Sequence, residues 1–416
     1  THIHRALAAR GNVPLIAETG GQNAMIVDAS ALPEQVVQDA IASAFDSAGQ
    51  RCSALRVLCL QQEIADRVIG MLAGAMRELV VGDPADLATD VGPIIDAAAK
   101  EALTAHVVRL EREAKRIARA RLDPATDARG LFLAPAAFEI PSLSVLKGEV
   151  FGPVLHVLRY RAGDEEALVD ALNDTGYALT LGIHSRIDAT AHRIVARTRA
   201  GNVYVNRNMI GAVVGVQPFG GEGLSGTGPK AGGPLYVPRL TRDPGDLPLA
   251  ARDAGSDDRG IELPGPTGET NTWRVAPRGR LVAVGGGDNS EAIWRAQADA
   301  ALAAGNRVIF APSAAGFIAA RHVASGHVYQ KSHIDVISPN ADWSALTDVD
   351  GVLAADPETA AAANRRVAAR AGPRLQVIEP AGDPPRYPPA RLVVERVVSV
   401  NTTAGGGNAS LVAAMD

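Results

Sequence analysis

The chain alternates between short apolar runs and longer segments in which apolar residues recur every three to four positions. The short runs include "NAMIVD", "ALRVLCLQ" and "PVLHVLRY", and the longer segments include "LPEQVVQDAIASAFDSAG" and "EIADRVIGMLAGAMREL". Short buried runs are typical of strands, whereas a period of 3.6 residues is typical of amphipathic helices. Strands that alternate with helices in this way predict an α/β fold with a mainly parallel sheet.

Predicted strands and a predicted helix surround the segment from Glu18 to Cys52, which contains the candidate functional residues. "VPLIAETGG" is apolar and ends in two glycines, so it predicts a strand that places Glu18 where strand gives way to loop. The next helical pattern has Pro33 in its first turn and ends at Gly49, and Cys52 follows at once. The expected local order is helix, a turn that carries Cys52, strand and helix.

The pattern changes after Arg239. The segment "TRDPGDLPLAARDAGSDDRG" is rich in Gly, Asp and Pro and lacks periodicity, which predicts a linker. Beyond it, "GRLVAVGGGDNSEAIWRAQADAALAAGNRVIFAP" predicts a strand, a Gly-rich turn, a helix and a strand. We therefore predict three parts: residues 1–240, a linker at 241–260, and a second α/β, Rossmann-like domain at 261–416. A chain of 416 residues also exceeds what one hydrophobic core usually serves.

The composition narrows the class of protein. Hydrophobic residues make up 47% and charged residues 21%, which is typical of a packed globular chain. A net charge of -5 without a basic cluster predicts no direct contact with nucleic acid. The apolar runs are short and interrupted by charges, so we expect neither a transmembrane segment nor a signal peptide. A soluble, cytoplasmic protein whose two cysteines stay reduced is expected.

Cys52 is a candidate nucleophile. A cysteine attacks as the thiolate, which nearby cations favour, and Arg51 and Arg56 lie close to it in sequence. The alternative is that Cys52 is a small buried side chain, as many single cysteines are. Cys59 lies inside the apolar run "RVLCLQ" and is assigned to the core.

Glu18 is a candidate general base. Thr19, Gly20 and Gly21 follow it, and such glycines let the backbone approach a ligand closely. A carboxylate at this place could activate a water molecule. The alternative is an ordinary acid at the edge of a loop.

Four motifs follow one another in a fixed order: "ETGGQNAMIVD", "FDSAGQRCSALRVL", "EVFGPVLHV" and "VNRNMIGAVVGVQPFGG". This order resembles the aldehyde dehydrogenase superfamily, which carries Glu-x-Gly-Gly, Gly-Gln-x-Cys, Glu-x-Phe-Gly-Pro and Pro-Phe-Gly-Gly. Within it, "GAVVGVQPFGGEGLSGTGPKAGGPLY" and the terminal "SVNTTAGGGNASL" resemble the L-glutamate γ-semialdehyde dehydrogenase half of the bifunctional proline utilization A family. The resemblance runs from about Val13 to the C-terminus.

This resemblance implies the NAD-dependent oxidation of L-glutamate γ-semialdehyde, formed from Δ1-pyrroline-5-carboxylate, to L-glutamate. In such enzymes the cysteine that matches Cys52 attacks the aldehyde, and an oxyanion forms that its own backbone amide and a side-chain Asn hold. Hydride then passes to NAD, which leaves a thioester. The acid that matches Glu18 activates the water that hydrolyses it.

The resemblance also implies which residues hold the cofactor. Glu149 matches the residue that holds the ribose hydroxyls of the nicotinamide half, Phe151 lies beside it, and Thr19 would offer backbone to the carboxamide. The residues that choose between NAD and NADP have no counterpart in this sequence.

The substrate residues implied by the resemblance lie in two motifs. Ser53, Gly211 and Ala212 match positions that bind the α-carboxylate, and Phe219 matches an aromatic wall. A Gly-Ala turn with free amides can form an anion nest. Arg51 is either an additional carboxylate clamp or part of a structural salt bridge.

Two departures from the family shape the expectation for the whole protein. In the family, three parts precede the position of Glu18: most of the dinucleotide domain, the catalytic Asn and the FAD-dependent proline dehydrogenase domain. We therefore expect this chain to be part of a longer polypeptide and to be inactive alone. We also expect the whole protein to form a homo-oligomer. In the C-terminal domain, "VAVGGGDNSEAIW" has Ser290 where a GxGxxG fingerprint needs Gly. The resemblance therefore implies a non-catalytic C-terminal domain whose last motif helps seal a substrate tunnel.

Three alternatives stay open. The chain could serve only in assembly or tunnel closure, it could oxidise another semialdehyde, or it could be a cysteine hydrolase that uses Cys52 with a histidine. None of the nine histidines lies in the motif of Cys52 or of Glu18, which argues against the hydrolase.

Overall fold

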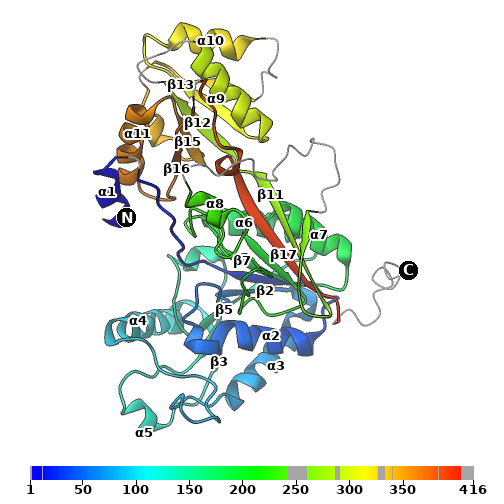
Figure 1. The fold of residues 1–416 in the computed structure, drawn as a ribbon. Coiled ribbons are helices and arrows are strands. Elements are labelled where there is room, and N and C mark those ends of the chain that lie inside the picture. The colour runs from blue at the N-terminus through cyan, green and yellow to red at the C-terminus, as the bar shows by residue number, and fades with distance from the viewer. Residues whose placement is uncertain are drawn as a thin grey trace. The chain divides into compact units, whose positions relative to one another are not determined.

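The computed structural model describes residues 2–11, 13–241, 260–285, 291–326, 333–339, 341–382 and 384–403. The chain forms two compact units, each built from three segments (Figure 1). The cysteine unit consists of Thr19–Ser225, Glu262–Thr272 and Val397–Asp416, and the C-terminal unit consists of Thr1–Glu18, Gly226–Ile261 and Trp273–Arg396. The three-part division at 241–260 stays a prediction, because residues 242–259 lie outside the described residues.

The cysteine unit alternates strands and helices. Its elements are β1 (Ala24–Val27), α2 (Pro33–Phe45), η1 (Asp46–Gly49), β2 (Val57–Gln61), α3 (Gln62–Glu78), α4 (Ala97–Glu113), β3 (Lys115–Arg119), α5 (Pro124–Asp127), β4 (Ala136–Glu139), η2 (Leu143–Val145), β5 (Val154–Tyr160), α6 (Glu165–Asp174), β6 (Tyr177–Ala178), β7 (Thr180–His184), α7 (Asp188–Arg197), β8 (Asn202–Val205) and β9 (Glu222–Gly223). The short strands β6 and β9 pair with each other.

The central strands of this unit are parallel. β1 pairs with β2 on one side and with β7 on the other, so that Ile26 lies opposite Cys59 and Ile183. The full order is β10-β11-β17-β8-β7-β1-β2-β5-β4-β3, and β3 pairs antiparallel with β4. β10 (Ile261–Leu263), β11 (Glu269–Pro277) and β17 (Val393–Asn401) carry residues of both units. The predicted α/β class with a mainly parallel sheet is confirmed.

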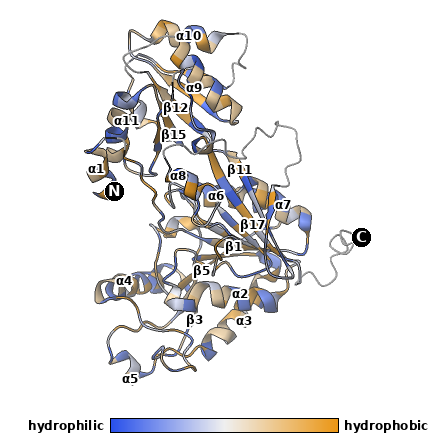
Figure 2. Ribbon diagram, viewed as in Figure 1, coloured by the Kyte–Doolittle hydropathy of each residue, from blue (hydrophilic) through white to orange (hydrophobic). Residues whose placement is uncertain are grey.

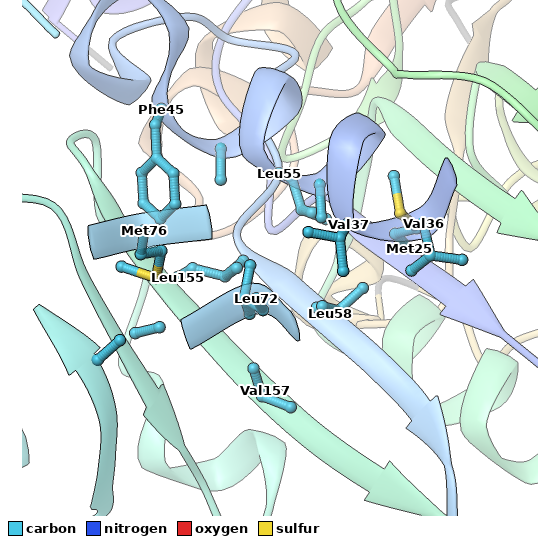
Figure 3. Close-up of a cluster of buried hydrophobic side chains, with 14 of the residues drawn as sticks. Met25, Val36, Val37, Phe45, Leu55, Leu58, Leu72, Met76, Leu155 and Val157 are labelled. Atoms are coloured by element: carbon cyan, nitrogen blue, oxygen red, sulfur yellow. The ribbon is translucent and has the colours of Figure 1, made fainter. Parts of the chain in front are cut away.

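Side chains of the central strands alternate between two helical layers. Met25, Leu58 and Leu155 point to a core with α2 and α3 (Figure 3), whereas Ile26 and Cys59 belong to a second core with α6 and α7. Strands buried on both faces read as continuous apolar runs, which explains why the sequence pattern located β1, β2 and β5. The helices carry both hydrophilic and hydrophobic residues (Figure 2).

The C-terminal unit has its own parallel sheet, in the order β14-β13-β12-β15-β16. Its elements are α1 (His2–Ala8), α8 (Tyr236–Arg239), β12 (Arg280–Val284), α9 (Glu291–Ala303), β13 (Arg307–Ala311), α10 (Phe317–Ser325), β14 (Ile334–Val336), η3 (Trp343–Ala345), β15 (Gly351–Ala354), α11 (Pro357–Ala369), β16 (Gln376–Ile378) and η4 (Pro389–Arg391). The predicted strand, helix and strand correspond to β12, α9 and β13. The Gly-rich turn with Ser290, at residues 286–290, and the end of the last motif, at residues 404–416, lie outside the described residues.

Two local predictions were wrong. Val13–Ala17 does not form a strand, and only Glu18 makes an isolated bridge, to Gly226. The helix expected to end at Gly49 ends at Phe45, because Asp46 has a ψ of 139°, outside the right-handed helical region, and Ser47 and Ala48 follow with positive φ. Within the described ranges, no helix combines the length and the apolar character that a membrane crossing requires.

Candidate active site

A left-handed turn leads from α2 to Cys52. Ser47, Ala48 and Gly49 have successive φ values of 56°, 55° and 64°. Side chains with a Cβ rarely adopt this region, and each such residue costs about 1–2 kcal/mol. Gly49 is required for a further reason, because a Cβ there would lie 2.4 Å from the carbonyl oxygen of Gly152. The turn thus holds the chain before Cys52 against the segment of Gly152.

The backbone around Cys52 is held by two buried polar side chains. The Asn23 Nδ2 donates to the carbonyl oxygens of Cys52 at 2.6 Å and Ala54 at 2.9 Å. The Asn23 Oδ1 accepts from the amide of Thr180 at 3.2 Å, and the Thr180 hydroxyl donates to the Ser53 carbonyl at 3.3 Å. Three consecutive carbonyl groups are therefore fixed, while the Cys52 side chain is half-buried. Sequence reasoning missed Asn23, although it lies directly before the first strand of the Glu-x-Gly-Gly motif.

Arg56 joins the turn of Cys52 to the segment of Glu149. Its guanidinium is fully buried and donates to the carbonyl oxygens of Gly49 at 2.6 Å and Arg51 at 3.0 Å, and to the Glu149 Oε1 at 3.1 Å. It also lies 5.2 Å from the centre of the Phe151 ring, a cation-π distance. The structure thus brings two of the predicted motifs together around one cation.

The charge of Arg56 acts on both motifs. Burial lowers the pKa of Arg56, and the negative charges of Glu149 and of a Cys52 thiolate act in the opposite direction. Such attraction is mutual, so the guanidinium is positioned to stabilise a thiolate at Cys52. Arg51, the second cation named from the sequence, instead donates from its Nε to the Ser47 hydroxyl at 2.9 Å. Within the described part of the chain, Arg51 makes no ion pair, and its role as a carboxylate clamp stays a prediction.

Cys59 differs from Cys52 in every respect that matters for reactivity. It is completely buried in β2, and burial raises the pKa of its thiol to about 12. Its assignment to the core is confirmed.

Gly20 lets the Glu149 carboxylate lie against the Thr19–Gly20 backbone. A Cβ on Gly20 would stand 1.5 Å from the Glu149 Oε2, which no side chain could tolerate. The Gln22 Nε2 donates to the Gly148 carbonyl at 3.0 Å and fixes the same approach. The Thr19 amide donates to the Ser225 carbonyl at 3.1 Å. The predicted cofactor residues Thr19 and Glu149 therefore belong to adjoining segments.

Two hydrogen-bonded histidines, His106 and His156, lead to the carbonyl oxygen of Arg56. The His156 Nδ1 lies 2.8 Å from that oxygen, so it must carry the proton, and its Nε2 must accept. The His106 Nε2, 2.9 Å away, is then the donor, and the His106 Nδ1 accepts from Arg109 at 3.3 Å. Burial lowers the pKa of His156 to about 3 and that of His106 to about 4, which keeps both rings neutral. The sequence offered no signal for this pair, which joins β5 to α4.

The predicted substrate loop is anchored next to the turn of Cys52. The Ser43 hydroxyl of α2 accepts from the Met209 amide at 3.1 Å, and the Ser43 carbonyl accepts from the Leu55 amide at 2.9 Å. Gly211 and Ala212 follow Met209 in an exposed loop, and Gly211 has a φ of 77°. No heavy atom lies within 4 Å of a Cβ built on Gly211, which leaves room for a ligand.

Phe219 and the end of the substrate loop are held by polar side chains. The Asn202 Nδ2 donates to the Pro218 carbonyl at 2.9 Å and its Oδ1 accepts from the Gly220 amide at 3.2 Å, so Asn202 fixes both sides of Phe219. Gln217 accepts from the Val213 amide at 3.0 Å. Phe219 itself is half-buried.

Glu269 of β11 accepts hydrogen bonds from the loop that follows β8 and holds it in place. The Glu269 carboxylate accepts from both Gln217 and Arg207. Ser53, the remaining substrate residue, is buried with 7% exposure.

Glu18 belongs to the C-terminal unit rather than to the cysteine unit. Its neighbour Ala17 donates from its amide to the Thr227 hydroxyl at 2.9 Å and accepts from the Thr227 amide at 3.0 Å. The backbone at Glu18 is therefore held by the segment of Gly226 and Thr227. The role of Glu18 as a general base stays a prediction.

Comparison with known proteins places these motifs in context. Residues 1–242 match the model of the family described as the aldehyde dehydrogenase family. Over 459 aligned residues the chain is 42% identical to the bifunctional protein PutA of Escherichia coli (strain K12), which covers 99% of this chain and 34% of that protein. It is 36% identical over 225 residues to the 1-pyrroline-5-carboxylate dehydrogenase of Geobacillus kaustophilus, which covers 54% of this chain and 43% of that protein.

Among solved structures, a proline utilization A mutant from Bradyrhizobium japonicum matches with a TM-score of 0.55 and 59% identity. The match covers 57% of this chain and 24% of that chain. The chain therefore spans about a third of the length of the PutA proteins that it resembles.

Proposed function

Because the chain belongs to the aldehyde dehydrogenase family, we propose that the longer protein of which it forms part oxidises L-glutamate γ-semialdehyde to L-glutamate with NAD in proline catabolism. The observation that carries the proposal is the buried Arg56, which joins the turn of the candidate nucleophile Cys52 to the candidate cofactor residue Glu149. The names of the relatives support the substrate, because they are a bifunctional PutA protein and a 1-pyrroline-5-carboxylate dehydrogenase.

In the proposed reaction the Cys52 thiolate forms a carbon-sulfur bond to the aldehyde carbon. The carbonyl electron pair moves to oxygen, and the Cys52 amide is suited to hold this oxyanion because Asn23 fixes the adjoining carbonyl. Loss of hydride from the same carbon leaves a thioester. Glu18 takes a proton from the water that attacks the thioester, and the thiolate leaves as glutamate forms.

The residues present fit a nicotinamide cofactor. Gly20 keeps the Glu149 carboxylate against bare backbone, where ribose hydroxyls can reach it, and Phe151 is 44% exposed beside it. The Thr19 amide already has a partner, so Thr19 would offer its carbonyl oxygen to the carboxamide. When bound, NAD supplies the acceptor for the hydride.

The exposed loop of Gly211 and Ala212, with Ser53 and Phe219, is proposed to recognise the substrate. Two backbone amides and one hydroxyl would hold the α-carboxylate, and the Phe219 ring would cover the aliphatic part. This arrangement selects an aldehyde that carries a carboxylate, as glutamate semialdehyde does.

The rest of the proposal concerns the whole polypeptide. The upstream part would be a FAD-dependent proline dehydrogenase that supplies the semialdehyde, and the C-terminal unit would be non-catalytic and help to close the path between the two sites. A cytoplasmic homo-oligomer is proposed.

The deciding experiment measures NADH formation from glutamate semialdehyde. It compares the full-length protein with its Cys52→Ala variant and with Cys59→Ala, a matched control in which the buried cysteine is replaced. We expect Cys52→Ala to lose turnover and Cys59→Ala to keep it. Turnover by Cys52→Ala at the wild-type rate would exclude Cys52 as the nucleophile.

The same proteins separate the alternatives. A chain that serves only in assembly would show no cysteine-dependent turnover at all, and a cysteine hydrolase would cleave an ester without NAD. Preference for glutamate semialdehyde over an aldehyde of the same length without the α-carboxylate should disappear in Ser53→Ala if Ser53 contacts that carboxylate.

A further inference from the structure

A pocket in the C-terminal unit is lined by cationic and polar side chains. It is a hollow that opens to solvent and has a cavity volume of about 20 Å³. Its lining residues include Arg239, Arg374, Arg391, His4 and Asn364. No acidic residue belongs to the lining that the structure describes. A cavity needs about 10–15 Å³ to hold one water molecule, so this pocket admits a group of a few atoms rather than a dinucleotide.

Arg239, in α8, is the least compensated cation of the pocket. Among the described residues, none forms a hydrogen bond or an ion pair with its guanidinium, and its Nε is buried without a partner. Burial lowers the pKa of Arg239, and no neighbouring charge raises it. A buried donor without an acceptor is costly, which indicates that an acceptor belongs there.

Arg391, in η4, lies within electrostatic reach of Arg239. Its Nη2 donates to the Val377 carbonyl at 2.9 Å, while its Nε is buried without a partner among the described residues. Burial lowers its pKa to about 9, with further lowering by the positive charges of Arg239 and Arg278 and partial compensation by Glu379. Arg391 therefore remains cationic at neutral pH and is repelled by two neighbouring guanidinium groups.

Arg374 adds a further cation to the lining. Its guanidinium donates to the carbonyl oxygens of Arg370 at 2.8 Å and Gly372 at 2.7 Å. Burial lowers its pKa, and so do the charges of Arg370 and Arg5. No ion pair among the described residues involves Arg239, Arg374 or Arg391, so the positive charge of this pocket is compensated only in part, by Glu379 near Arg391.

His4 supplies a ligand atom that is already oriented. The Asn364 Nδ2 donates to the Gly11 carbonyl at 3.2 Å, so the Asn364 Oδ1 is the acceptor for the His4 Nε2 at 2.9 Å. The His4 Nδ1 is buried without a hydrogen-bond partner among the described residues, in a side chain that is 4% exposed. Because its Nε2 carries the proton, the Nδ1 of neutral His4 is an acceptor, which suits the hydroxyl group of a hydrogen phosphate ion.

We propose that this pocket binds a small phosphate-type oxyanion through the guanidinium groups of Arg239 and Arg391 and the Nδ1 of His4. A dianion with several acceptor oxygens matches several cations better than a carboxylate does, because it offers more charge and more acceptors. Free inorganic phosphate and the phosphate of a mononucleotide share this chemistry. The site is independent of the proposed dehydrogenase function, since none of the candidate dehydrogenase residues belongs to its lining.

The test is titration calorimetry and thermal unfolding with inorganic phosphate at constant ionic strength, with potassium chloride as the balancing salt. The proteins are the wild-type chain, Arg239→Gln, Arg391→Gln, and Arg307→Gln as a control in which an exposed arginine of the same unit is replaced. We expect saturable binding that raises the Tm of the wild type and of Arg307→Gln. Each pocket variant should bind at least about tenfold more weakly, as the loss of a charge-assisted hydrogen bond predicts. Arg239→Gln should also have a higher Tm than the wild type without phosphate, because a repelling cation is gone.

Further titrations identify which ligand the pocket binds and whether another part of the protein fills it. AMP that binds more tightly than phosphate would assign the site to a mononucleotide, and weaker binding would assign it to the free ion. Glutamate that binds as tightly as phosphate would overturn the proposed ligand class. Equal phosphate affinity in Arg239→Gln and Arg307→Gln would overturn the site, and so would the absence of saturable binding. Binding by this chain that disappears in the full-length protein would show that an upstream segment fills the pocket, which also overturns the proposal.

Discussion

Replacement of Arg56 by lysine tests whether one guanidinium organises the candidate active site. Lysine keeps the positive charge but lacks the planar fork that reaches two backbone carbonyls and the Glu149 carboxylate at once. Loss of two of these three bonds, at about 1.5–3 kcal/mol each, predicts a free energy of unfolding lower by about 3 kcal/mol or more. The exposed Arg67, which pairs with Glu34 at 3.0 Å, is a matched control, and Arg67→Lys should cost less than about 1 kcal/mol.

Urea unfolding of the chain measures both changes, and a double-mutant cycle with Glu149→Gln isolates the pair. We expect Arg56→Lys and Glu149→Gln to be coupled by about 1 kcal/mol or more, because the two side chains touch. For the proposed dehydrogenase activity of the full-length protein, Arg56→Lys should raise the KM for NAD, since the candidate cofactor residue Glu149 loses its fixed position. A purely structural role of Arg56 would leave the KM unchanged. An Arg56→Lys protein as stable as Arg67→Lys, with no coupling to Glu149, would refute the reasoning.

Three further predictions follow from the same region. Gly20→Ala should displace the Glu149 carboxylate and abolish NAD-dependent turnover, whereas Gly148→Ala, whose Cβ meets no heavy atom within 4 Å, should leave it intact; equal activity of the two would contradict the close approach. Ser47→Gly should stabilise the chain by about 1 kcal/mol in urea unfolding through relief of the positive φ, while Ser47→Ala, which loses the same hydroxyl but keeps the Cβ, should not. Because the pKa values of His106 and His156 are lowered to about 4 and about 3, the unfolded chain binds more protons than the folded chain below about pH 6.5, so stability should fall as the pH drops from 7 to 4. In the double variant His106→Leu/His156→Leu, the free energy of unfolding should fall less steeply between these pH values. An unchanged dependence on pH would contradict the conclusion that both histidines are neutral in the folded chain. Burial raises the pKa of Asp39 to about 6, which acts in the opposite direction in both proteins.

The helices and strands that the sequence predicts correctly are those whose own residues show a clear pattern. β1 is apolar at every position and β2 at every position but Gln61, because both faces of each strand are buried. Pro33 marks the first turn of α2. Val13–Ala17 is also apolar but forms no strand, since an apolar run does not specify which partner strand it will meet.

The sequence predicts only part of the candidate site, because contacts between residues far apart in the chain leave no pattern in either segment. The four motifs point to Cys52 and Glu149, and in the structure Arg56 contacts both of their segments. Arg56 was read as a cation near Cys52 in sequence, yet its decisive partner Glu149 is 93 residues away. The left-handed conformation of Ser47 and Ala48 has no local signal, because neither residue type favours it and the surrounding contacts impose it.

The interleaving of the two units has a consequence for anyone who expresses parts of this chain. Val397–Val400 of β17 pair with Asn202–Val205 of β8, so a gene cut at residue 260 removes one of the two neighbours of β8 along with most of the C-terminal unit. The shortened protein would present a bare row of amide and carbonyl groups, which is a template for aggregation. Soluble halves should therefore be recovered by co-expression, where the two fragments can complement one another, more readily than by purifying either fragment alone.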